Sequence, residues 1–200
     1  MTSNLYTLQA VLVTRREFLA SSALFLVRTD PVRIHVVGEH AGAALALDEM
    51  SRTASLLGRA IDRSKHADAT VIDVAHQSVE ASGQRFVVAA SQQARAAALA
   101  SWRDPRAHAA VEWHPKLTKY GAEQLNARFL QRFGQPMDAA AWMSWMLVKV
   151  AVDAQLRSVA LAEGRFDGHK GVPLAFGPDR HLIQPLCVVD AAGALLGVTE

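Results

Sequence analysis

The chain has 200 residues and a mass of 21.6 kDa; half of its residues are hydrophobic and a fifth are charged. The length allows one ordinary domain or two small ones, and the composition is typical of a globular chain and excludes collagen-like, low-complexity and disulfide-rich classes. Because 21 basic and 19 acidic residues leave a formal net charge of only +2, we expect no nucleic-acid partner.

The first thirty residues resemble an export signal. Arg15 and Arg16 precede a Phe-Leu pair, and a short apolar stretch then ends at Val27. This order is similar to a twin-arginine signal, so it predicts a targeting segment over residues 1–30 and a periplasmic location for the rest of the chain. No small-residue cleavage motif follows Val27, and a chance pair of arginines before an amphipathic helix is the alternative. No later segment predicts a transmembrane helix.

Residues 31–200 are expected to form a single α/β domain that opens with a strand and a helix. A β-branched run predicts the first strand at residues 32–38. Apolar residues at helical spacing, followed by Gly58, predict a helix over residues 42–57. Residues 59–68 are polar and without a pattern.

The middle of the chain predicts further short elements. Apolar runs rich in β-branched residues indicate strands at residues 70–75 and 85–90. An alanine-rich helix is expected over residues 92–103 with Ser91 as its cap, and a short strand follows at residues 109–113.

The last part of the chain predicts two longer helices and two strands. Residues 117–133 place apolar side chains on one face, and Gly134 ends that helix. Asp138 is expected to cap a buried helix that runs to residue 163, because apolar residues nearly encircle it. Strands are expected at residues 172–176 and 182–189. This alternation of strands and helices predicts a doubly wound or related α/β sheet.

Polar and aromatic residues follow two of the predicted strands. Glu39 and His40 lie in the loop after the first strand, and Trp113 and His114 lie at the end of the fourth. Ligands of α/β proteins bind at loops after the carboxyl ends of strands, so we take these four as candidate ligand-binding residues. The alternatives are a plain turn in the first loop and, in the second, a tryptophan that anchors the turn.

Sequence motifs of catalysis and metal binding are absent. The eight histidines lack the close spacings, supported by cysteine or carboxylate, that zinc sites show. No nucleophile elbow, phosphate-binding loop or dinucleotide fingerprint occurs. Cys187 is the single cysteine and lies in an apolar run, so we expect it to pack in the core. The sequence therefore predicts no enzyme activity, no metal and no cofactor.

Two blocks of residues share their pattern with a known family. Residues 31–38 read PVRIHVVG and residues 42–50 read GAALALDEM; the second block contains Trp113-His114-Pro115-Lys116-Leu117 and the helical run that starts at Tyr120. The first block, residues 31–59, is similar to the first strand and helix of type I periplasmic solute-binding proteins of ABC importers. The second, residues 85–190, resembles the second lobe of the subgroup associated with PQQ-dependent alcohol dehydrogenase systems.

The resemblance implies a partial type I periplasmic-binding-protein fold in which most of the first lobe is missing. It implies an extracytoplasmic component of an ABC-type transport system that binds a small organic molecule without catalysis. The implied partners are that small molecule and an ABC permease or a second copy of the chain. An accessory or interaction protein of a PQQ-dependent alcohol oxidation system, without ligand binding, is the alternative. An enzyme with shifted titratable groups around His114 or Cys187 comes third.

Overall fold

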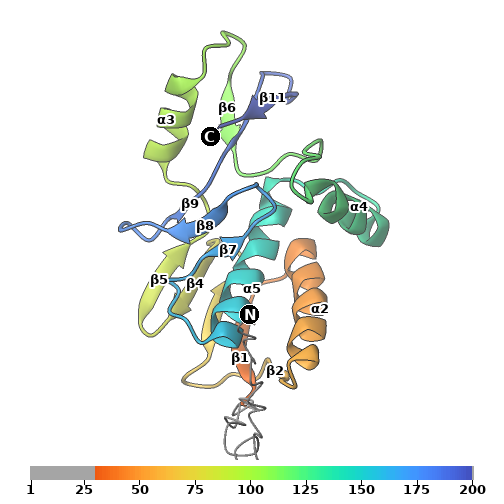
Figure 1. Ribbon diagram of the computed structural model, residues 1–200, viewed down its shortest axis with the longest axis vertical. Helices are drawn as coiled ribbons and strands as arrows, with labels where there is room; N and C mark the ends of the chain where they lie inside the picture. Colours follow the sequence, from red (N-terminus) through yellow and green to blue (C-terminus); the bar gives the residue numbers. More distant parts are fainter. Residues whose placement is uncertain (1–29, 200) are drawn as a thin grey trace, which may run out of the picture.

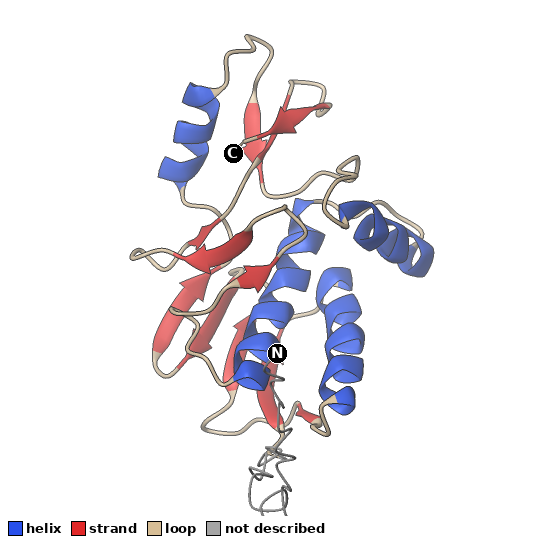
Figure 2. Cartoon of the chain, viewed as in Figure 1, coloured by secondary structure: helices blue, strands red, loops and turns tan. Residues whose placement is uncertain are grey.

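The computed structural model describes residues 30–199 and shows a mixed α/β protein (Figures 1 and 2). Its largest sheet, the main sheet, has five strands in the order β2-β1-β3-β4-β5. These strands are β1 (Val32–Val37), β2 (Ile61–Asp62), β3 (Thr70–Asp73), β4 (Ser78–Ala81) and β5 (Gln84–Val87). Strands β2, β1 and β3 pair in parallel, whereas β4 and β5 pair antiparallel. The predicted α/β class is thus confirmed.

Two helices cover one face of the main sheet. Helix α2 (Ala41–Leu56) packs along α5 (Ala139–Arg157), and α5 contacts β1, β3 and β4 (Figure 1). Along β1, Val32 and Ile34 are fully buried, whereas Arg33 and His35 are half-buried. Because successive side chains of a strand point to opposite faces, one face of the sheet packs on the helices and the other is more open.

The two long helices differ from their predicted limits for local reasons. Asp138 caps α5 as predicted, since its side chain accepts a hydrogen bond from the amide of Ala141 at 2.7 Å. The predicted end at residue 163 is wrong, because Ser158 adopts a left-handed conformation, with φ 56°, that ends the helix. Helix α4 (Ala122–Phe133) begins at Ala122 and not at residue 117 as predicted, because Tyr120 has a positive φ and belongs to the preceding loop.

Two smaller antiparallel sheets and a further helix, α3 (Gln92–Ser101), complete the fold (Figure 1). One sheet, in the order β11-β10-β6, contains β6 (Ala109–Val111), β10 (Cys187–Val189) and β11 (Leu195–Val198). The other contains β7 (Phe166–Asp167), β8 (Pro173–Phe176) and β9 (Leu182–Ile183). It packs on the main sheet, because the rings of Phe176 and Phe86 lie 5.0 Å apart between centroids.

Several short strands escape the sequence patterns. The sequence predicts nothing at β2, β4, β7 or β11, and the single strand expected at residues 182–189 is two strands separated by Pro185. Strand β4 has no run of β-branched residues. It forms because tight turns at Gln77 and Ser82, both with positive φ, fold it against β3 and β5.

Crossing a bilayer would need a longer run of apolar helix than any that residues 30–199 contain. The export signal expected over residues 1–30 lies outside the described residues, apart from Asp30.

Helices α2 and α5 approach each other closely at Gly42. A Cβ atom on Gly42 would lie 1.8 Å from the carbonyl oxygen of Ala141 and 3.0 Å from the amide nitrogen of Trp145. Both atoms belong to the backbone of α5, so they cannot rotate out of the way. The contact between the two helices therefore requires glycine at this position.

We predict that Gly42→Ala lowers the free energy of unfolding by about 1–3 kcal/mol or more, because the added methyl group forces α2 away from α5. At an exposed helical position the same exchange stabilises by about 1 kcal/mol, so the sign of the change is informative. Urea unfolding followed by tryptophan fluorescence measures it. Ser51→Ala, at an exposed position of α2, is the control and should change stability by less than about 0.5 kcal/mol. A Gly42→Ala variant as stable as the wild type would contradict the close approach.

Candidate functional site

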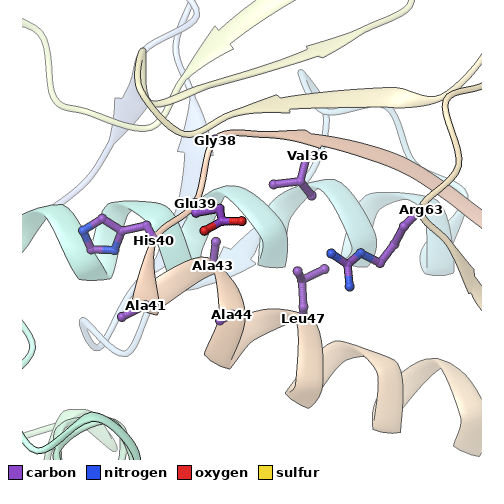
Figure 3. Close-up of a pocket in the computed structure, with 9 residues that line it drawn as sticks. All are labelled: Val36, Gly38, Glu39, His40, Ala41, Ala43, Ala44, Leu47 and Arg63. Carbon is purple, nitrogen blue, oxygen red and sulfur yellow. The ribbon is translucent and has the colours of Figure 1, made fainter.

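Glu39 and His40 lie at a pocket of about 610 Å³, the Glu39 pocket, formed by the end of β1, the start of α2 and Arg63 (Figure 3). The Nδ1 atom of His40 accepts a hydrogen bond from the amide of Gly42 at 3.2 Å and caps α2. Its ring points away from Arg63 (Figure 3). Glu39 and Arg63 are exposed. This first predicted loop therefore lines a pocket, but its imidazole serves the helix end.

Trp113 is a core residue. Only 1% of it is exposed, and its ring stacks on that of Trp142 with 5.6 Å between centroids and 8° between planes. Its Nε1 atom donates a hydrogen bond to Oδ1 of Asn126 at 2.9 Å. These contacts favour the second of the two readings of the sequence, a tryptophan that anchors the turn after β6.

His114 fixes the same turn. The amide of Lys116 donates a hydrogen bond to Nδ1 of His114 at 3.1 Å, so the proton of the neutral ring lies on Nε2 and points to the carbonyl oxygen of Gly193 at 3.0 Å. Neither nitrogen is free for a ligand. Trp113 and His114 thus hold in place the loop of residues 115–121, which forms one wall of a second pocket.

This second pocket, the Lys170 pocket, has a volume of about 470 Å³ and lies among the loop before α4, the loop after β7 and the ends of β10 and β11. Its charged lining residues are Lys116, Lys119 and Lys170, and none of the described residues that line it is acidic. The chain contains five lysines and sixteen arginines, yet the pocket gathers three lysines and no arginine. The other lining residues are Leu117, Thr118, Tyr120, Gly171, Val172, Pro185, Cys187, Gly197, Val198 and Thr199.

Lys170 is buried, which is unusual for a lysine. Its Nζ atom donates hydrogen bonds to Oε1 of Gln184 at 2.6 Å and to the carbonyl oxygen of Pro185 at 2.7 Å, and it lies 4.3 Å from the centroid of the Trp142 ring. Burial lowers the pKa of Lys170 to about 7, although the nearby Cys187 and Glu112 act in the opposite direction. Near neutral pH the amine is therefore present in both its charged and its neutral form.

Cys187 lies in the wall of the same pocket and is buried, so the predicted core position is confirmed. Burial raises the pKa of the thiol, while Lys170 and a hydrogen bond from the backbone amide of His114 lower it by less. Because the thiolate is the nucleophilic form of cysteine, a thiol with a raised pKa is poorly reactive. Cys187 contributes shape to the pocket rather than a nucleophile.

Two loops beside the Lys170 pocket contain strained backbone. Tyr120 and His169 both have left-handed conformations, with φ of 59° and 57°, and Nδ1 of His169 lies 3.3 Å from the carbonyl oxygen of Tyr120. The ring of Tyr120 covers Gly171, where a Cβ atom would lie 2.7 Å from the ring. Such conformations in residues other than glycine cost about 1–3 kcal/mol each and cluster at functional sites.

Lys170 is not among the site residues that the sequence predicts. A lysine between histidine and glycine in a loop gives no periodic signal, and its burial depends on contacts with α5 and with residues 184–185, which lie far away in sequence. No three histidine, cysteine, aspartate or glutamate side chains of residues 30–199 lie close enough together to hold a metal ion.

Comparison of the chain with models of known protein families gives no match, and comparison with curated proteins gives none either.

We predict that stability depends on pH through Lys170. In the unfolded chain its pKa returns to the usual 10.5, against about 7 in the folded protein. Below pH 7 the amine is charged in both states and the full cost of burying the charge opposes folding. Above pH 7 the folded protein binds fewer protons than the unfolded chain, so its stability rises with pH, by at most ~1.4 kcal/mol per unit.

Chemical unfolding at pH 7, 8 and 9 tests this prediction at constant ionic strength. The wild type should gain stability over this interval relative to Lys170→Met, which keeps an apolar stem and carries no charge. The range stops at pH 9 because the raised pKa of Cys187 acts in the opposite direction above it. If the stability of the two proteins changed equally with pH, burial would not shift the pKa of Lys170.

Proposed function

We propose that this protein binds a small organic acid in the Lys170 pocket without catalysing a reaction. The observation that carries the proposal is the gathering of three of the five lysines around one pocket that has no acidic residue among its described lining. An excess of positive charge in a concave site attracts anions and disfavours amines. A carboxylate is one small anionic group that this arrangement suits.

The remaining walls suit a small organic ligand. Apolar side chains of Leu117, Val172 and Val198 would cover a hydrocarbon part, and the hydroxyl groups of Thr118 and Thr199 would donate to or accept from polar substituents. The volume of about 470 Å³ lies within the usual range for small-molecule sites. The Glu39 pocket is the weaker candidate, because it places one carboxylate and one guanidinium on exposed rims.

The setting of this binding activity is inferred from the resemblance of residues 31–59 and 85–190 to periplasmic solute-binding proteins. We infer an extracytoplasmic component of an ABC-type transport system that delivers its ligand to a permease. The partial periplasmic-binding-protein fold belongs to the same proposal. Binding without turnover is compatible with Cys187, whose pKa is raised by burial.

We predict that small monocarboxylic acids stabilise the protein and that their amides, which have the same shape without the charge, do not. An acid at a hundred times its Kd should add about 2.7 kcal/mol and raise Tm by several degrees. Thermal shift and titration calorimetry measure the effect for acetate, lactate and pyruvate. The double variant Lys116→Ala and Lys119→Ala should weaken binding about tenfold, or ~1.4 kcal/mol.

Arg63→Ala is the matched control, since it removes a cation at the Glu39 pocket and should leave acid binding unchanged. If Arg63→Ala abolishes binding and the lysine variant does not, the ligand lies in the other pocket. If no acid shifts Tm and size-exclusion chromatography gives a stable dimer, the accessory protein without ligand binding replaces this proposal.

A further inference from the structure

We propose that Lys170 captures the carbonyl group of a small oxo acid as a reversible imine. This inference rests on the proposed function and makes it more specific: the ligand would carry a ketone or aldehyde beside its carboxylate. Lys116 and Lys119 would attract the carboxylate from the exposed side of the pocket, and the Lys170 amine would meet the carbonyl carbon at its buried side.

The Lys170 amine lies beside the wall of the pocket. Lys170 is a lining residue, and its Nζ atom is hydrogen-bonded to the carbonyl oxygen of Pro185, which is also a lining residue. The second acceptor, Oε1 of Gln184, holds the same nitrogen from the neighbouring residue. Two acceptors on adjacent residues, of which only Pro185 lines the pocket, thus fix the position of the amine.

The number of hydrogen-bond acceptors suits the neutral amine. A neutral lysine has two N–H donors and one lone pair, and Nζ of Lys170 has two oxygen acceptors, at 2.6 and 2.7 Å. These two acceptors can take both N–H groups of the neutral amine, and neither of them competes for its lone pair. A lysine that burial deprotonates near neutral pH is a nucleophile, whereas an exposed lysine carries a proton in place of the lone pair.

The reaction needs no component beyond the amine and the ligand. The nitrogen lone pair attacks the carbonyl carbon, the C–N bond forms, and a proton moves from nitrogen to oxygen to give a carbinolamine. The hydroxyl group then leaves as water together with the second N–H proton, which leaves a neutral C=N bond, and hydrolysis reverses both steps without any oxidation or reduction. The neutral imine can then take up a proton from water, and the Trp142 ring, whose centroid lies 4.3 Å from Nζ, would stabilise this cationic form.

Reductive trapping tests the proposal on the full chain. The protein is incubated with pyruvate and sodium cyanoborohydride, which reduces an imine to a stable secondary amine, and the modified lysine is located by peptide mass spectrometry. We expect saturable modification at Lys170 that exceeds modification at each of the other four lysines at least tenfold. Lactate, which has a hydroxyl group in place of the carbonyl, should compete for the pocket and suppress the reaction.

Lys149→Arg is the matched control, because Lys149 also lies over a tryptophan, 5.6 Å from the centroid of Trp145, but outside the pocket. This variant should leave the yield at Lys170 unchanged, whereas Lys170→Arg should abolish the saturable product. The main result comes from the wild type, so it does not depend on the folding of a variant.

Two further results separate this inference from the proposed function. If lactate and pyruvate bind by calorimetry but trapping modifies the exposed lysines and spares Lys170, covalent capture is overturned and acid binding stands. If neither acid binds and Lys170 is not modified, both proposals are overturned.

Discussion

Trp142 is the residue on which the structure of the candidate site depends. It belongs to α5, the buried helix that supports the main sheet, and its ring stacks on Trp113 at the end of β6. Its Nε1 atom donates a hydrogen bond to the carbonyl oxygen of Gly168 at 3.2 Å, and its ring lies beside the Lys170 amine. One side chain thus joins the main sheet, the smaller β11-β10-β6 sheet and the loop that carries Lys170.

This arrangement buries the amine of Lys170, which is energetically unfavourable. Burying a lysine removes its charge from water, and the two carbonyl acceptors and the tryptophan ring offset only part of that penalty, since the pKa of Lys170 still falls to about 7. The strained backbone at Tyr120 and His169 adds a further cost at the same pocket. Because shifted titratable groups and strained residues gather at functional sites, their coincidence here favours this pocket over the more open one at Glu39.

The sequence predicts the elements whose signals are local. Three such elements are strand β1, helix α2 and the start of α5. The sequence predicts them because β-branched runs, helical spacing and an aspartate cap act over a few residues. Strand β4 cannot be predicted from its own residues, which are mostly polar or small, because it forms through pairing with β3 and β5. The end of α5 depends on one backbone conformation, at Ser158.

The candidate site shows the same division. Glu39 and His40 are predicted as ligand-binding residues because ligands often bind at loops after strands, and both residues line a pocket. Trp113 and His114 lie beside the Lys170 pocket, but they support the loop that forms its wall and do not line it. Lys170 itself becomes conspicuous only through burial against residues distant in sequence, which no periodicity records.

The central claim is that the three lysines form the binding site of an organic acid. Backbone amide chemical shifts of the full chain during titration with lactate test it most directly, because they report the location of binding as well as its affinity. The account predicts saturable shifts confined to residues 116–120, 170–172 and 197–199, around the Lys170 pocket. Saturable shifts at residues 38–44 and 63, around the Glu39 pocket, or no shifts at any lactate concentration, would contradict it.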